Sequence, residues 1–137
     1  MLESIADVLI VENGKVLLVQ QKTQSAYGLW GFPGGHLEPG ETPQEAIVRE
    51  IQEELGAELV QVKPFKVARI QRASGELELN TFTGTLRGPV VLEDDELMAY
   101  GWFSLESLQI MRGKLRLSIL LENAQELLIS PSSAADK

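Results

Sequence analysis

The stretch that decides the fold of this chain runs from residue 35 to residue 57 and reads GHLEPGETPQEAIVREIQEELGA. It places Glu50, Glu53 and Glu54 at the spacings i, i+3 and i+4. On a helix, residues at these spacings are neighbours, so the three carboxylates would meet on one patch of its surface. Like charges cost a helix about 0.2 to 0.5 kcal/mol for each i,i+4 pair. A patch that costs stability indicates a function, and hard carboxylate oxygens suit Mg2+ or Mn2+.

Both ends of this predicted helix carry signals. Thr42, Pro43 and Glu45 fit an N-cap, a proline at the first helical position and the glutamate of a capping box. Gly56 stands where a left-handed residue ends a helix. We therefore expect a helix over about residues 42 to 55, with the acidic patch beside its apolar stripe. A solvated acidic face is the alternative interpretation of the charges alone. The stripe consists of Ile47, Val48, Ile51 and Leu55.

The segment before the helix, residues 30 to 35, reads WGFPGG and is rich in turn residues. Its double glycine lets the backbone approach a ligand closely, so a carbonyl there can reach a metal ion. Loop and helix together match the pattern G-x5-E-x7-R-E-U-x-E-E-x-G-U, where U is a bulky aliphatic residue. Only the last position departs from it, because Ala57 is small. This pattern is the Nudix box, and the chain resembles the MutT-type Nudix hydrolases over about residues 4 to 128.

The resemblance implies a metal site in the box. Glu50, Glu53 and Glu54 would bind a divalent cation, Mg2+ with Mn2+ as a substitute, helped by the carbonyl of Gly34 or Gly35.

The same resemblance assigns supporting roles to other box residues. Arg49 would hold a carboxylate in place through charge-assisted hydrogen bonds, with Glu41 as the first candidate partner and Glu50 as the second. Gly56 would support the end of the helix.

A further acidic residue is expected later in the chain. MutT-type members carry one upstream of a tryptophan on a late strand, and Glu96 stands six residues before Trp102. The alternative interpretation of the acidic run at 93 to 96 is a solvated loop. The resemblance leaves the general base open between Glu50 and Glu96. The expected catalytic residues are Arg49, Glu50, Glu53 and Glu96.

Nudix enzymes hydrolyse nucleoside diphosphates linked to another moiety. Residues that mark the enzymes for dinucleotide polyphosphates, ADP-sugars or NADH are not found here, which favours (deoxy)nucleoside triphosphates, oxidised ones included. The products would be a monophosphate and pyrophosphate. Tyr27 and Phe82 are candidate base contacts, Arg72 is a candidate phosphate contact, and His36 is expected to be a plain loop residue. The alternatives are an ADP-ribose or nucleotide-sugar pyrophosphatase and a noncatalytic nucleotide-binding regulatory module.

Length and composition fit one enzyme domain. The 137 residues are 44% hydrophobic, enough for a proper core, and we expect one domain over residues 1–129 followed by a disordered tail at 130–137. The net charge of −8 argues against nucleic acid polymers and anionic membranes as partners, leaving a small nucleotide bridged by metal.

There is no cysteine, no signal peptide is expected, and no apolar run approaches a membrane span, so a cytoplasmic setting is expected. The resemblance leaves a homodimer open.

The remaining pattern predicts an α/β fold. Strands at 6–11 and 15–19 flank Asn13-Gly14, a strong hairpin signal. Pro64 marks a bend or an edge. The resemblance implies the same architecture, a Nudix-type α/β/α sandwich with a mixed sheet. Further strands are expected at 59–62, 66–71, 76–86 and 98–103, with helices from Ser104 to about residue 108 and over 115–128.

Overall fold

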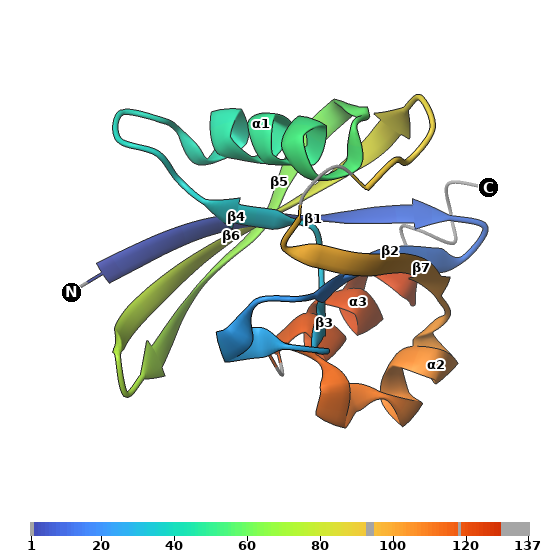
Figure 1. The fold of residues 1–137 in the computed structure, drawn as a ribbon. Coiled ribbons are helices and arrows are strands. Elements are labelled where there is room, and N and C mark those ends of the chain that lie inside the picture. The colour runs from blue at the N-terminus through green and yellow to red at the C-terminus, as the bar shows by residue number, and fades with distance from the viewer. Residues whose placement is uncertain (1, 93–94, 118, 130–137) are drawn as a thin grey trace. The chain divides into compact units, whose positions relative to one another are not determined.

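The computed structural model describes residues 2–92, 95–117 and 119–129. The chain forms two compact units, one made of Met1–Ile10 and Pro33–Asp94, the other of Val11–Phe32 and Asp95–Lys137. Figure 1 shows the elements of each unit in ribbon form.

The first unit contains a mixed sheet. Its strands lie in the order β4 (Gly34–His36), β1 (Leu2–Glu12), β6 (Gly75–Arg87) and β5 (Glu58–Arg72). β1 pairs in parallel with β6 and antiparallel with β4, while β5 and β6 form an antiparallel hairpin. The predicted α/β class with a mixed sheet is therefore confirmed.

β5 differs from its prediction, because one strand replaces the two expected at 59–62 and 66–71. Its pairing with β6 shifts register between Val60 and Lys63 and again between Pro64 and Lys66. Gln61, inside the first shift, has a positive φ of 55°. Pro64 lies beside the second shift, where a residue without an N–H is tolerated. The proline bends the pairing without ending the strand.

Helix α1 (Pro43–Leu55) lies on one face of this sheet (Figure 1). The capping box is formed, since Thr42 Oγ1 accepts a hydrogen bond from Glu45 N at 3.1 Å and Glu45 Oε1 accepts one from Thr42 N at 2.9 Å. Gly56 ends the helix in the left-handed region with φ of 63°. Both predicted ends are confirmed. Val48 is the exception in the apolar stripe because it is exposed. The fully buried stripe consists of Ala46, Ile47, Ile51 and Leu55.

The second unit is built around β2 (Lys15–Gln21), which pairs antiparallel with β3 (Trp30–Gly31) and β7 (Leu97–Phe103). The last residues of β1 pair with the start of β2 around Asn13 and Gly14, whose φ angles are 53° and 75°. The predicted hairpin is confirmed. The 3-10 helix η1 (Gln24–Ala26) precedes β3.

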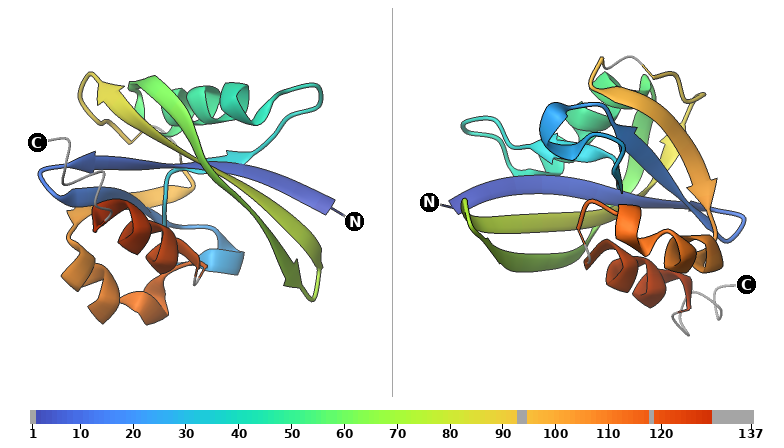
Figure 2. Two further views of the ribbon diagram at one scale, coloured as in Figure 1. Left: turned by 180° about the vertical axis from the view of Figure 1, so that it is seen from behind. Right: turned by 60° about the horizontal axis from the view of Figure 1, so that its bottom comes forward.

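Helices complete the second unit, where α2 and α3 lie side by side (Figure 2). Ser104 caps α2 as predicted, with its Oγ accepting a hydrogen bond from Ser107 N at 3.2 Å. The helix expected at 115–128 begins later, because Leu115 forms a parallel bridge with Trp30 and Arg116 N donates to Trp30 O at 2.7 Å. The elements are α2 (Leu105–Ile110), η2 (Arg112–Lys114) and α3 (Ile119–Leu128).

Some predictions fall outside the described residues, namely the disordered tail at 130–137 and the first half of the 93–96 acidic run. Of the helices within the described ranges, none has the length and apolar character that a membrane crossing requires.

Candidate functional site

The glycine loop and the acidic helix meet in the first unit. Gly34 N donates a hydrogen bond to Glu54 Oε1 at 3.1 Å. A Cβ atom at position 35 would lie 2.6 Å from Glu50 Cδ, and one at position 34, where φ is +152°, would lie 2.1 Å from Ala6 O. Position 34 therefore requires glycine, and at position 35 an added Cβ would displace the Glu50 carboxylate. These glycines bring the backbone close to a box carboxylate and to β1, and the approach of the loop to a ligand stays a prediction.

Arg49 organises the box by bonding several carboxylates at once. Its Nε and Nη2 donate to the two oxygens of Glu41 at 2.7 and 2.9 Å, which is a bidentate pair. Its Nη1 donates to Glu50 Oε2 at 2.9 Å and to Glu53 Oε1 at 3.0 Å. Both candidate partners named from the sequence are present, and Glu53 is a third.

The bidentate pair fixes the charge of both members. The hydrogen bonds from Arg49, followed by one from the Glu38 backbone N–H at 2.9 Å, lower the pKa of Glu41 to about 2. The bond to Glu41 raises the pKa of Arg49 above its usual value. The Glu41 side chain is only 13% exposed and that of Arg49 22% exposed, so the pair is well shielded from water.

A second ion-pair group ties β4 to its neighbours. His36 Nε2 bonds a carboxylate oxygen of Glu3, whose other oxygen accepts from Arg72 Nη2. These two contacts, with His36 the larger cause, hold the pKa of Glu3 below its usual value. The His36 carbonyl also accepts from Arg49 Nη2 at 3.1 Å. His36 and Glu3 thus anchor the strand that carries the glycine loop, and Arg72 is engaged with Glu3.

The three glutamates that the sequence predicts as metal ligands carry suitable donor atoms. Glu50, Glu53 and Glu54 offer carboxylate oxygens, the ligands that Mg2+ and Mn2+ prefer. Within the described residues, no three acidic, histidine or cysteine side chains are gathered as a metal site. Arg49 Nη1 bonds Glu50 and Glu53, whereas Glu54 bonds Gly34 N. The donor set fits a divalent cation, and its binding here stays a prediction.

Other predicted site residues are spread over both units. Phe82 is buried on β6 of the first unit. Tyr27, just after η1, is 67% exposed and belongs to the second unit, as does Glu96 in the turn before β7. Their roles remain predictions.

The sequence analysis missed Asp7, a buried carboxylate in the middle of β1. Its Oδ1 accepts a hydrogen bond from Thr81 Oγ1 at 2.6 Å, and it pairs in register with Gly34. The sequence could have pointed to Asp7, because an acidic residue inside a strongly apolar strand is usually buried only when it has a partner.

A glycine loop and an arginine-bound set of glutamates on one mixed sheet define a candidate site for metal-assisted chemistry on phosphates. A family model described as the NUDIX domain matches residues 1–123. The chain belongs to the Nudix hydrolase family, and the MutT-type resemblance is confirmed.

The similar proteins include enzymes with different named activities. The chain is 38% identical over 94 residues to the CTP pyrophosphohydrolase of Escherichia coli, covering 64% of this chain and 68% of that protein. It is 42% identical over 57 residues to the 8-oxo-dGTP diphosphatase of Proteus vulgaris, covering 41% of this chain and 51% of that protein. The putative nudix hydrolase 1 of Caenorhabditis elegans is 32% identical over 108 residues, covering 77% of this chain, which spans only 28% of its length.

A solved structure gives the same fold. The MutT NUDIX hydrolase of Burkholderia pseudomallei superposes with a TM-score of 0.77 at 27% identity, covering 90% of this chain and 98% of that one.

Proposed function

We propose that this chain is a Mg2+-dependent nucleotide pyrophosphohydrolase that converts a (deoxy)nucleoside triphosphate, oxidised forms included, into the monophosphate and pyrophosphate. The observation that carries the proposal is Arg49, which bonds Glu41, Glu50 and Glu53 beside the glycine loop. An arginine used in this way sets the positions of acidic groups. Phosphoryl transfer depends mainly on such positioning and on charge stabilisation.

In this proposal, Glu50, Glu53 and Glu54 hold the divalent cation. When bound, the cation neutralises negative charge on the phosphate oxygens. Arg49 positions the carboxylates, and its bidentate bond to Glu41 keeps its guanidinium from rotating. Glu50 or Glu96 takes the proton of the water whose oxygen bonds to phosphorus, while the bond to the leaving pyrophosphate breaks.

Two of the relatives support triphosphates as the substrate class, since they carry CTP or 8-oxo-dGTP in their names. The net charge of −8 also supports a cation between protein and polyanion. A cytoplasmic location is part of the proposal.

The test is a substrate panel with purified protein. It should contain canonical and oxidised nucleoside triphosphates, dinucleotide polyphosphates, ADP-ribose and nucleotide sugars, each with Mg2+ and with Mn2+. We expect a triphosphate to give monophosphate and pyrophosphate in equal amounts. We also expect turnover to be lost when the divalent metal ion is chelated. Preferential cleavage of ADP-ribose or a nucleotide sugar would replace the substrate assignment. Tight nucleotide binding without turnover of any compound would instead indicate a noncatalytic module.

A further inference from the structure

A pocket of about 510 Å³ lies in the first unit, between the first turn of α1 and the strands β5 and β6. This volume falls within the range of about 300 to 1,000 Å³ that is typical of small-molecule sites. Neither Arg49 nor the glutamates that it bonds line the pocket. Pro43, which does, precedes Glu50 by seven residues, or about 10 Å along a helix axis. The pocket is therefore a place separate from the carboxylates.

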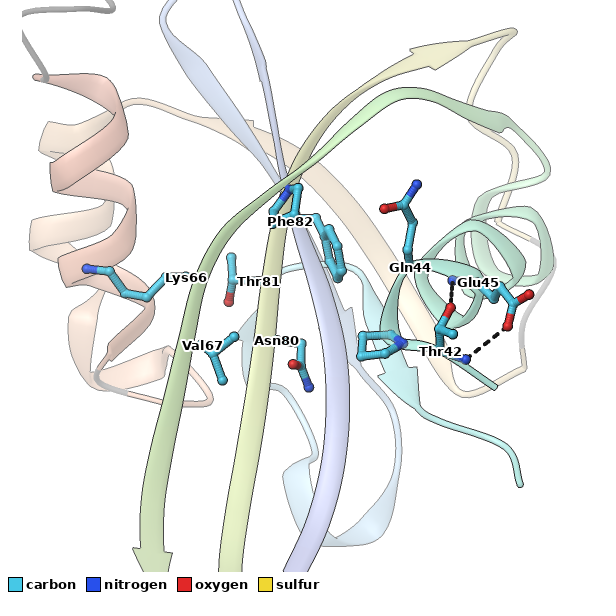
Figure 3. Close-up of a pocket in the computed structure, with 10 residues that line it drawn as sticks. Thr42, Gln44, Glu45, Lys66, Val67, Asn80, Thr81 and Phe82 are labelled. Atoms are coloured by element: carbon cyan, nitrogen blue, oxygen red, sulfur yellow. Dashed lines mark hydrogen bonds between the residues drawn. The ribbon is translucent and has the colours of Figure 1, made fainter. Parts of the chain in front are cut away.

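The floor of the pocket is mostly apolar and comes from paired residues of the hairpin. Phe82 is in register with Pro64, and Asn80 with Val67. Figure 3 shows Phe82 and Asn80 on the side of the strands that faces α1, with Lys66 pointing away from that helix. Phe82 is 5% exposed and Val67 is 62% exposed, so the floor rises from a buried ring to an open rim. A pocket lined by the ring of Phe82 and by Pro43 and Pro64 suits a flat, apolar ligand.

Asn80 supplies a polar group in this floor. Its Nδ2 donates to Ile5 O at 3.2 Å and lies 3.5 Å from Glu78 Oε1. Both partners are acceptors, which fixes the orientation of the amide. Asn80 as a residue is 7% exposed and lines the pocket. An amide oxygen has two acceptor lone pairs, so a ligand N–H can bind to Asn80 Oδ1 there.

The wall formed by α1 carries one carboxylate, that of Glu45, which disfavours a phosphate, beside neutral polar groups. The Glu45 carboxylate is bonded to Thr42 N, and Thr42 Oγ1 is bonded to Glu45 N. The exposed amide of Gln44 stands beside them. The wall therefore favours an uncharged ligand surface that can exchange hydrogen bonds with an amide.

We infer that this pocket binds a flat heteroaromatic ring that carries an N–H donor, a ring of the nucleobase type. The ring lies against Phe82 and Pro43, and its N–H donates to Asn80 Oδ1. The ring belongs either to the nucleotide substrate or to a separate nucleoside that binds as a second ligand. Only the first of these assignments rests on the proposed function.

Nucleosides without phosphate test the pocket independently of catalysis. The four common ribonucleosides are titrated into metal-free, 15N-labelled protein, and backbone amide shifts are followed by NMR. Val67→Trp fills the pocket from its exposed rim, and Val91→Trp is the control, an exposed valine of the same unit that does not line the pocket. We expect shifts at Val67, Asn80 and Phe82 in the wild type and in Val91→Trp, and their loss in Val67→Trp. The inference is overturned if no nucleoside moves these amides, or if the shifts persist in Val67→Trp.

Kinetics then separate the two sources of the ring. If it belongs to the substrate, Val67→Trp should raise KM about tenfold with kcat nearly unchanged, the effect of losing one stacking contact. If it belongs to a second ligand, KM stays unchanged and nucleosides still shift the pocket amides at saturating nonhydrolysable triphosphate. Nucleoside binding without any hydrolysis would remove the proposed function and leave the pocket assignment standing.

Discussion

Replacement of Gly35 by alanine should displace the Glu50 carboxylate while leaving the fold intact. The new Cβ would lie 2.6 Å from Glu50 Cδ and from Oε1, and 2.8 Å from Oε2. Unstrained carbon contacts are about 3.5 to 4.0 Å, so the carboxylate must move by about 1 Å. These atoms are the far end of a flexible side chain, and the position has no left-handed φ. The free energy of unfolding should therefore change by less than about 1 kcal/mol.

Activity should respond much more strongly. A misplacement of about 1 Å at a catalytic group can cost about 100-fold in rate, or about 2.7 kcal/mol in the barrier. We expect kcat on the best triphosphate to fall by about this factor, and the Mn2+ concentration needed for half-maximal rate to rise. Steady-state kinetics with a metal titration measure both quantities.

Gly40→Ala is the matched control, a second glycine five residues later in the chain. Position 40 has φ of +81° and no atom within 4 Å of an added Cβ. This variant should lose about 1 kcal/mol of stability through backbone strain and keep its kcat. Wild-type kcat and metal dependence in Gly35→Ala would refute the reasoning that Gly35 exists to seat Glu50.

Four other predictions follow from the site and the core. Glu53→Gln and Glu54→Gln should each remove most turnover and weaken metal dependence while circular dichroism shows an intact fold; unchanged kinetics would refute their ligand role. Arg49→Ala should lower kcat through misplaced carboxylates, and a wild-type rate would count against its positioning role. Because the pKa of Glu41 is lowered to about 2, its pairing stabilises the fold fully above its ordinary pKa of 4.5, and this stabilisation is lost as the pH falls towards 2. Glu41→Gln should therefore make the free energy of unfolding, measured with urea, fall less steeply between these pH values. Asn123 is 1% exposed, and its amide has no hydrogen-bond partner within the described residues. Asn123→Leu should therefore stabilise the protein by about 1 to 3 kcal/mol in the same assay. A loss of stability would show that the amide is bonded.

The parts of the fold that depend on neighbouring residues were predictable. Thr42 and Glu45 exchange hydrogen bonds within one helical turn, and Gly56 ends the helix because its backbone adopts the left-handed conformation. The Asn13-Gly14 hairpin is equally local. The pairing of Arg49 with Glu41 was implied by the resemblance to the Nudix family, with Glu50 as the second candidate.

Long-range contacts decided the features that the sequence did not indicate. Leu115 pairs with Trp30, which is 85 residues earlier, and this delays the start of α3. Pairing with β6 carries β5 past Pro64 as one strand. Helical spacing put three glutamates in one region, but Gly34 N decided the direction of Glu54, and no local rule contains that bond.

The strand β5 also bears on behaviour at high protein concentration. It is 15 residues long and ends the strand order of its sheet, so one side of its backbone could recruit a strand from another molecule. Two bulges twist the strand, and Lys63 and Lys66 add positive charge along it. The bulges and the lysines both discourage pairing with a strand of another molecule. We therefore expect the exposed edge of the hairpin not to promote fibre formation.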